Sequence, residues 1–408
     1  MNRRTLLSSC TALAAATALG PLAPAAVAHP AAVAHPAAVA HPGQEEPVRF
    51  QLPAPDGPYP VGTVALHLAD TARPDPWVPS RPCRELMISI WYPARGGTAR
   101  TTAPWMPAAA ADRYLDLLGV PPGRVHLGNT HGHQGAPVGG PPGPLPVVLY
   151  SPGADASRSF GTGVVEDLAS HGFLVVTVDH TYDAAAVAFP GGRVETSPPG
   201  GIGDSAKALA VRTADIRFVL DRLAVLYSGG HPGARPAPLP AGLRRALDLQ
   251  RVGMLGHSLG GATTAATMHT DRRITAGASL DGGAAGPVVT AGLDRPFLVV
   301  DTPGKGGMDN NPALRTFWSH LRGWRLHLTV RGAAHQSFGD DELILPLIAP
   351  LLGMSPPDLE DEVGTIPGHR AQAFQRAYPR AFFDLHLRHR GQLLDGPSPD
   401  FPEVAYAR

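Results

Sequence analysis

The segment GHSLGG, residues 256–261, places Ser258 between two glycines. An apolar run that predicts a β-strand comes before it, and a run rich in Ala and Thr that predicts a helix follows. In such a strand-to-helix turn the serine has strained dihedral angles that hold its hydroxyl away from the backbone. Side chains in place of Gly256 and Gly260 would collide with neighbouring backbone. The pattern therefore indicates that Ser258 is a nucleophile that attacks an ester carbonyl and forms an acyl-serine.

A serine nucleophile needs a base, and the base needs an acid that orients it. The best candidate for the base is His335, which follows the last strand-like run and precedes a helix-like run. His320 falls within a predicted helix and His327 within a predicted strand, and both are interpreted as structural. Because a histidine base must be neutral, activity is expected to rise with pH around the reference histidine pKa of about 6.5.

Two aspartates are candidates for the acid, and the residues alone do not choose between them. Asp281 ends the strand-like run 274–281, directly after the predicted nucleophile helix. Asp301 ends the next strand-like run. Either carboxylate could reach His335 from the carboxyl edge of a parallel sheet.

The negative charge that develops on the attacked carbonyl oxygen needs backbone N–H donors, which form an oxyanion hole. One donor is expected from Leu259, the residue after the nucleophile. The other is expected from the loop YSPGADASR, residues 150–158, where Ala154 follows Gly153. This chemistry requires no metal and no cofactor, so none is expected.

The rest of the pattern predicts a sheet that could bring these residues together. Apolar runs alternate with helical runs from residue 146 onward, which is typical of a parallel sheet with helices on both faces. The runs 59–70 and 84–94 predict an antiparallel pair before it, and a Gly/Pro-rich loop is expected up to residue 144. The predicted strands are 146–153, 173–180, 252–257, 274–281, 296–302 and 324–332, and the predicted helices are 103–119, 160–171, 205–226, 261–268 and 369–390, the last kinked or broken at Pro379.

The first 40 residues predict export. Arg3 and Arg4, a weakly apolar Ala/Leu stretch and an Ala-Val-Ala segment follow in the order of a secretory signal, and the arginine pair resembles a twin-arginine (Tat) signal. The segment AAVAHP then occurs three times between residues 25 and 42. After cleavage Cys83 is the one remaining cysteine, so no intrachain disulfide can form. We expect a secreted protein with a signal and repeats in residues 1–40 and one catalytic domain in residues 41–408.

Charge argues against nucleic acid as a partner. The chain has 34 Lys and Arg residues and 34 Asp and Glu residues, whereas binding to phosphates needs a basic excess. His126, His131 and His133 could bind a metal, but they lie in a glycine-rich loop without a nearby carboxylate and are interpreted as solvated. Nothing in the sequence indicates an oligomeric state.

Several segments resemble the platelet-activating factor acetylhydrolase family, in its secreted, type II group, from about residue 61 to residue 335. RELMISIWYPA and APWMP are similar to two early segments of the family, and YSPGADASRSFGTGVVEDLASHGFLVVTVDH is similar to its oxyanion strand and the stretch after it. GHSLGG, LDGG and HQSF resemble its nucleophile, acid and histidine motifs, in the same order and with similar spacing. LASHGF and HQSF are much more specific than G-x-S-x-G.

The resemblance implies an α/β-hydrolase fold with lid insertions. It implies Ser258 as nucleophile, His335 as base and Asp281, rather than Asp301, as acid. It also implies that the substrate is a small-molecule ester or lipid, above all a phospholipid with a short sn-2 acyl chain. The enzyme would reach such a substrate by transient contact with a lipid surface. Departures from the family concern docking and the leaving group: Pro152 stands where members often carry a histidine, residues 227–240 are a Pro/Gly-rich insertion, and the lid regions 105–145 and 182–204 are rich in Gly, Pro and Ala.

Other functions remain open from the sequence. A general carboxylesterase or a cutinase-like polyester hydrolase would need the same serine turn, and a binding protein of the same fold would usually lack one of the three catalytic residues. An apolar group could line the entrance to the site or simply pack on the sheet. Its members are Trp105, Met106, Leu115, Leu117 and Leu118.

Overall fold

The structure is a computed structural model that describes residues 46–96, 100–198, 201–304 and 307–407. The predicted signal and the AAVAHP repeats lie outside these residues, so export stays a prediction. None of the helices in the described part of the chain is both long and apolar enough to span a bilayer.

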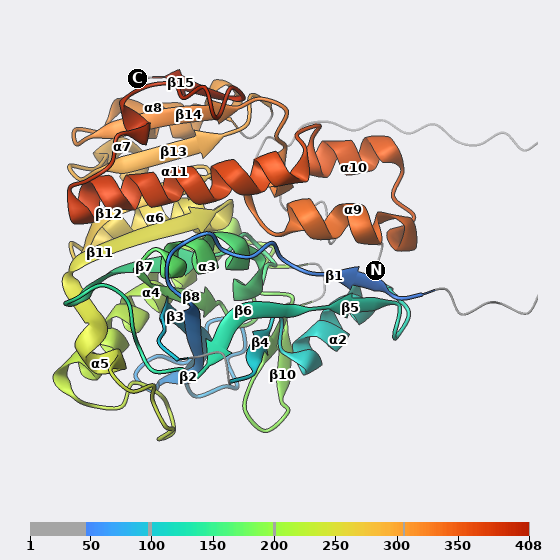
Figure 1. Cartoon of the computed structure of the whole chain (residues 1–408), viewed down its shortest axis with the longest axis vertical. Helices are drawn as coiled ribbons and strands as arrows, with labels where there is room; N and C mark the ends of the chain where they lie inside the picture. Colours follow the sequence, from blue (N-terminus) through green and yellow to red (C-terminus); the bar gives the residue numbers. More distant parts are fainter. Residues whose placement is uncertain (1–45, 97–99, 199–200, 305–306, 408) are drawn as a thin grey trace, which may run out of the picture.

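An eleven-stranded mixed sheet runs through the molecule (Figure 1). Six central strands are parallel, namely β8, β7, β11, β12, β13 and β14. Strands β2 and β3 form the predicted antiparallel pair. In spatial order the strands are β15 (Val404–Ala407), β14 (Arg325–Val330), β13 (Phe297–Asp301), β12 (Ile274–Leu280), β11 (Leu247–His257), β7 (Leu145–Ser151), β8 (Leu174–Asp179), β3 (Arg84–Pro93), β2 (Val61–Asp70), β6 (Asn129–Gln134) and β4 (Thr102–Pro104). Two small sheets pair β1 (Val48–Phe50) with β5 (Val125–Leu127) and β9 (Ala186–Ala188) with β10 (Val194–Thr196).

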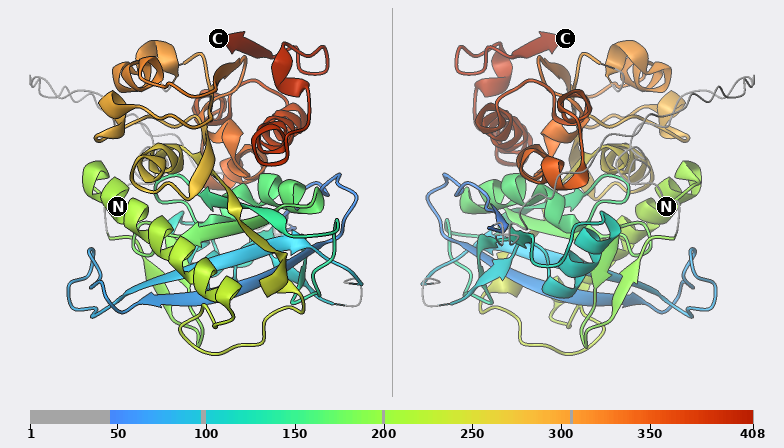
Figure 2. Two further views of the ribbon diagram at one scale, coloured as in Figure 1. Left: turned by 90° about the vertical axis from the view of Figure 1, so that its left-hand side faces the viewer. Right: turned by 90° about the vertical axis from the view of Figure 1, so that its right-hand side faces the viewer.

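Helices cover both faces of the sheet, as predicted. Side chains of β7 alternate between two cores, because successive residues of a strand point to opposite faces: Val147 and Leu149 enter one, Val148 and Tyr150 the other. The first core is closed by α4, α6 and α8, and the second by α3 and α11, as the two side views in Figure 2 show. The helices are α2 (Ala108–Leu117), α3 (Thr162–Ser170), α4 (Ser205–Ser228), α5 (Leu243–Ala246), α6 (Leu259–Thr270), α7 (Val288–Ala291), α8 (Pro312–Ser319), α9 (Asp341–Leu352), α10 (Pro356–Val363) and α11 (Gly368–Arg388), with short 3₁₀ turns that include η2 (Arg158–Gly161) and η4 (His335–Phe338).

The structure differs from the predicted elements in several places. Helix α11 continues through Pro379, since it buries Phe374, Tyr378 and Phe382 against the sheet, and this burial outweighs the cost of a proline inside a helix. The expected loop before residue 144 contains β5 and β6, and β15 was missed. Strands β5 and β15 have three and four residues, and β6, which lies between β2 and the edge strand β4, has six mostly polar residues, so none of them shows a periodic apolar pattern.

Most of the apolar group at residues 105–118 packs in a core rather than around an entrance. Trp105 and Met106 are 3% and 2% exposed and belong to a third cluster of buried side chains. The indole of Trp105 lies edge-on to the rings of Phe50 and Phe160, at centroid distances of 5.3 and 5.0 Å. Its Nε1–H donates a 2.8 Å hydrogen bond to Asp340, which ties this cluster to the start of α9. The packing alternative is therefore correct for Trp105 and Met106.

Candidate active site

Ser258 lies in the sharp turn between β11 and α6. Its backbone has φ 54° and ψ −121°, a strained conformation for a residue with a side chain. A Cβ atom at Gly256 would lie 2.1 Å from the carbonyl carbon of Gly260, and one at Gly260 would lie 1.9 Å from the Ser151 carbonyl oxygen. Both glycines are therefore required by close backbone contacts, as the sequence predicted.

The structure brings Ser258, His335 and Asp281 together, although 77 and 54 residues separate the histidine from the other two. The Ser258 hydroxyl lies 2.9 Å from Nε2 of His335. On the other side of the ring, Nδ1 of His335 lies 2.5 Å from the Asp281 carboxylate. The three residues follow β11, β12 and β14, whose parallel alignment brings their carboxyl ends to one edge of the sheet. This geometry allows His335 to accept the serine proton while Asp281 fixes the ring.

Asp281 is held in place by its own backbone and by a neighbouring loop. It has a positive φ of 46°, and its second carboxylate oxygen accepts a 3.1 Å hydrogen bond from the Thr302 N–H. Burial by itself raises the pKa of the Asp281 carboxyl, but the hydrogen bond and charge of His335, with the Thr302 N–H, lower it below its usual value. The carboxylate is therefore ionised at neutral pH and can stabilise a protonated His335.

Asp301, the other candidate acid, has different partners. Its carboxylate lies 2.8 Å from Nε2 of His327 and accepts a 2.7 Å hydrogen bond from the Met308 N–H. His327 and Asp301 lie on adjacent strands, β14 and β13. The structure thus places both residues in a structural contact beside the site.

The two aspartates can be separated by matched substitutions. We expect Asp281→Asn to lower kcat by about 10⁴-fold, since an amide no longer stabilises the protonated histidine. Asp301→Asn is the control and should change kcat by less than about threefold while lowering the melting temperature. Steady-state hydrolysis of p-nitrophenyl acetate measures both. Equal losses in the two variants, or a larger loss in Asp301→Asn, would contradict this assignment.

His257 contacts His335, and nothing in the sequence singles it out beyond its place in the serine motif. Its ring lies 4.8 Å from the His335 ring, and its Nε2–H donates a 2.9 Å hydrogen bond to the His335 carbonyl oxygen. Burial and the neighbouring charge of His335 lower the pKa of His257 to about 3, so this ring is neutral at physiological pH. His257 therefore anchors the backbone of His335.

Acidic side chains at the start of α9 and the end of α10 lie close to His335. Burial, together with the charges of Asp340 and Glu362, raises the pKa of Asp341 to about 8. Burial also raises the pKa of Glu362, which accepts a 3.4 Å hydrogen bond from the Gln336 side chain. At pH 7 Asp341 is largely protonated, so it adds little negative charge beside the base.

The predicted oxyanion loop lies next to Ser258. Leu259 is the first residue of α6 and Ala154 follows Gly153, as expected. A Cβ atom at Gly153 would lie 3.4 Å from the Ser258 Cβ, so the chain passes the nucleophile at van der Waals distance. The roles of the Leu259 and Ala154 N–H groups stay a prediction.

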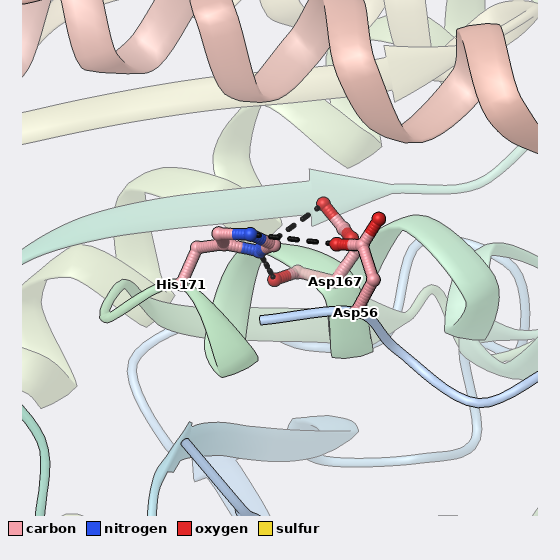
Figure 3. Close-up of side chains that lie close together, drawn as sticks. All are labelled: Asp56, Asp167 and His171. Atoms are coloured by element: carbon pink, nitrogen blue, oxygen red, sulfur yellow. Dashed lines mark hydrogen bonds and ion pairs between the residues drawn. The ribbon is translucent and has the colours of Figure 1, made fainter. Parts of the chain in front are cut away.

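Two groups of side chains contain histidine together with other possible metal ligands. His131 and His133 lie on β6. The sequence predicted no carboxylate near them, but the carboxylate of Glu166 on α3 lies 3.0 Å from His131 Nδ1. This contact joins residues 35 positions apart and forms only on folding. A second group joins Asp56, Asp167 and His171 (Figure 3). Arg380 donates hydrogen bonds to both of these carboxylates, at 3.0 and 3.2 Å, so a guanidinium already stands where a cation would bind.

Comparison with known proteins identifies the family. The family model for platelet-activating factor acetylhydrolase, isoform II, matches residues 46–192 and 240–355. A probable 1-alkyl-2-acetylglycerophosphocholine esterase from Arthroderma benhamiae is 28% identical over 393 residues, which cover 88% of this chain and 94% of that protein. The platelet-activating factor acetylhydrolase of Cavia porcellus is 24% identical over 218 residues, 48% of each chain.

A solved structure extends the comparison. The ferulic acid esterase from Streptomyces cinnamoneus has a TM-score of 0.73 and 37% identity, covering 87% of this chain and 98% of that chain. Together with the mostly parallel sheet, this likeness establishes an α/β-hydrolase fold. This chain belongs to the platelet-activating factor acetylhydrolase family, isoform II, and is a carboxylic ester hydrolase.

Proposed function

We propose that this protein is a serine esterase in which Ser258, His335 and Asp281 form the catalytic triad. The observation that carries the proposal is the continuous contact from the Ser258 hydroxyl through the two ring nitrogens of His335 to the Asp281 carboxylate. His335 takes the proton of Ser258 as the oxygen attacks the ester carbonyl, and the leaving alcohol then receives this proton. Water, activated by the same histidine, releases the acid and restores the serine.

The acyl group that we propose is short, in the manner of an sn-2 acetyl group on a glycerophospholipid. Membership of the acetylhydrolase family and the fungal relative's printed activity support this substrate class. In the described part of the chain, Tyr227 and Leu347 are the exposed large hydrophobic side chains. Because firm membrane docking needs a larger apolar face, the protein is expected to act on dispersed substrate more readily than on bilayers.

A second candidate is an ester of an aromatic acid. The ferulic acid esterase matches this chain at higher identity than the acetylhydrolases, and over nearly its whole length. This observation favours a hydroxycinnamoyl ester as the alternative substrate.

A substrate panel tests the proposal. It compares phosphatidylcholines with sn-2 chains from acetyl to palmitoyl, p-nitrophenyl esters of the same acids, and methyl ferulate. A sharp preference for the acetyl phospholipid, by about tenfold or more in kcat/KM, supports the proposal. A preference for methyl ferulate selects the second candidate, and activity on soluble short esters alone makes the protein a general carboxylesterase.

A further inference from the structure

We propose that Arg212 is a positioning residue for the oxyanion hole. It lies on α4, in the segment 193–239 that the family model does not match. The inference rests on the proposed serine mechanism and goes beyond it. Arg212 touches neither Ser258 nor His335, yet the inference gives it a role in stabilising the transition state.

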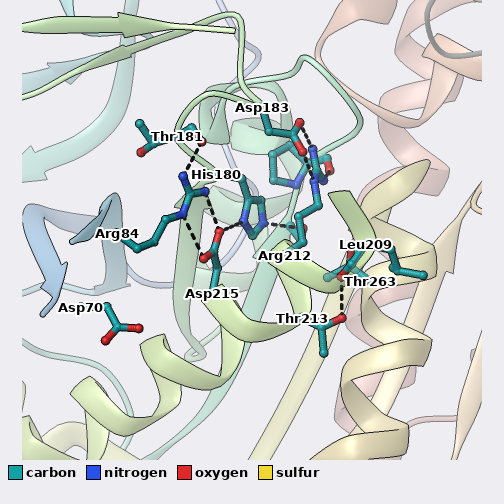
Figure 4. A network of polar contacts seen from close by, with 12 residues as sticks. Asp70, Arg84, His180, Thr181, Asp183, Leu209, Arg212, Thr213, Asp215 and Thr263 are labelled. Atoms are coloured by element: carbon teal, nitrogen blue, oxygen red, sulfur yellow. Dashed lines mark hydrogen bonds and ion pairs between the residues drawn. The ribbon is translucent and has the colours of Figure 1, made fainter. Parts of the chain in front are cut away.

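Arg212 is fully buried and has a fixed orientation. Its exposed fraction is 0%, and its guanidinium donates to both carboxylate oxygens of Asp183, at 2.7 and 2.5 Å. Asp183 is itself buried and follows β8 by four residues. A two-point contact of this kind fixes the plane of the guanidinium, which a single contact would not do. Figure 4 shows Arg212 reaching from α4 to Asp183 beside the second buried ion pair, Arg84 and Asp215.

The remaining donors of Arg212 bind the oxyanion loop. Nη1 donates a 2.5 Å hydrogen bond to the Pro152 carbonyl, and Nη2 donates a 2.8 Å hydrogen bond to the Gly153 carbonyl. The described residues contain no cis peptide bond, so the peptide between Gly153 and Ala154 is trans. In a planar trans peptide the N–H points opposite to the carbonyl. Arg212 therefore turns the Gly153 carbonyl toward α4 and the Ala154 N–H away from it.

The loop also lies against the nucleophile, because a Cβ atom at Gly153 would be 3.4 Å from the Ser258 Cβ and 3.3 Å from Nδ1 of His257. The loop is thus held between a buried cation and the reacting serine. The cation has a second effect: it withdraws electron density from the Gly153 carbonyl, which makes the N–H of the same peptide a stronger donor. Both effects are present before substrate binds, as an oxyanion hole requires.

Asp183 and the backbone beyond Ala154 complete the support. Asp183 accepts a 3.4 Å hydrogen bond from the Asp155 N–H, and the Asp155 carbonyl accepts a 2.8 Å hydrogen bond from the Ala185 N–H. Asp155 has a positive φ of 59°, which reverses the chain direction after the oxyanion residue. Without Arg212 the Pro152 carbonyl would lose the hydrogen bond from Nη1, and the Gly153 carbonyl would keep only the 3.3 Å hydrogen bond from the Ala156 N–H. Rotation of these two peptides would relieve the cost of a buried acceptor that has lost its donor.

The test compares Arg212→Met with Arg84→Met. Arg84 is an equally buried arginine with two carboxylate partners, Asp215 and Asp75, and has no contact with the 152–154 loop, so it is the matched control. Two inhibitors are used with each variant: a trifluoromethyl ketone, which Ser258 converts to a tetrahedral oxyanion, and the corresponding secondary alcohol, which cannot react. Active sites are counted with a fluorophosphonate, so that rates refer to folded protein.

For Arg212→Met we expect kcat/KM on p-nitrophenyl acetate to fall by about 10²-fold, the usual effect of losing one oxyanion donor. Affinity for the ketone should fall by a similar factor, and affinity for the alcohol by less than about threefold. Arg84→Met should lower the melting temperature and leave the ratio of the two affinities unchanged. Arg212→Lys, which keeps the charge but cannot make all four contacts, should lie between Arg212→Met and wild type.

Three outcomes would overturn the inference. The first is a folded Arg212→Met whose ratio of ketone to alcohol affinity is unchanged, and the second is an equal change of that ratio in Arg84→Met. If Arg212→Met does not fold, the third is wild-type activity in Arg212→Lys. Ser258→Ala separates this failure from failure of the mechanism. If Ser258→Ala is inactive while the Arg212 variants are normal, the triad stands and the positioning role fails.

Discussion

Ser258→Ala is expected to lower kcat for p-nitrophenyl acetate by about 10⁴- to 10⁶-fold, since it removes the hydroxyl that would form the acyl intermediate. The Ser258 Oγ is the atom that His335 Nε2 contacts at 2.9 Å, and alanine removes it while leaving the backbone of the turn. The melting temperature should change little, because the hydroxyl makes no contribution to the hydrophobic core. Steady-state kinetics and thermal unfolding measure these two effects, and a fluorophosphonate labelling assay reports the loss of the nucleophile.

A double variant provides the control for this experiment. If Ser258 and His335 act as one unit, Ser258→Ala combined with His335→Ala should be no slower than Ser258→Ala alone. A loss of only a few-fold in Ser258→Ala, or labelling of the variant by the fluorophosphonate, would mean that a different nucleophile carries the reaction.

Gly260→Ala is expected to destabilise the protein by roughly 3–5 kcal/mol and to abolish activity, through steric overlap in a packed core. Inside an exposed helix the same change would stabilise by about 1 kcal/mol, because alanine favours the helix. Here the added Cβ would lie 1.9 Å from the Ser151 carbonyl oxygen and 2.8 Å from the Pro152 carbonyl oxygen. The backbone that must move is the start of the oxyanion loop, so the damage reaches the site directly.

Thermal unfolding and active-site counting test this prediction. Gly396→Ala is the matched control: its added Cβ meets no atom within 4 Å, and its backbone is extended, with φ −178°. It should unfold at the wild-type temperature with full activity. Wild-type stability in Gly260→Ala would show that α6 and β7 are further apart than the structure places them.

Local patterns were enough to predict the nucleophile and the central sheet. The contact between Gly256 and Gly260 joins residues four positions apart, so the turn is visible in the sequence as G-x-S-x-G, although the contact of Gly260 with the Ser151 carbonyl forms only on folding. The parallel strands from β7 to β14 are buried on both faces and therefore appear as continuous apolar runs. Strands β4 and β6 were missed because they are short and polar and form by pairing at the sheet edge.

Long-range contacts determined the partners of the charged groups. Asp281 and Asp301 both end apolar strands and look equivalent along the chain. Their difference arises because β14 places His327 beside Asp301, whereas the loop after β14 returns His335 to Asp281.

The sequence by itself determined the serine turn and the parallel sheet and indicated His335 as the proposed base, because each leaves a pattern within a short stretch of chain. The residues alone left Asp281 and Asp301 equivalent, and it was the family resemblance that implied Asp281. The contact between Asp281 and His335, and the two carbonyls that Arg212 binds, are decided by the tertiary structure. An arginine on an amphipathic helix looks the same in sequence whether it is solvated or buried. The two carbonyls that Arg212 binds lie 59 and 60 residues away in the sequence, and they meet the guanidinium only when α4 packs on the sheet.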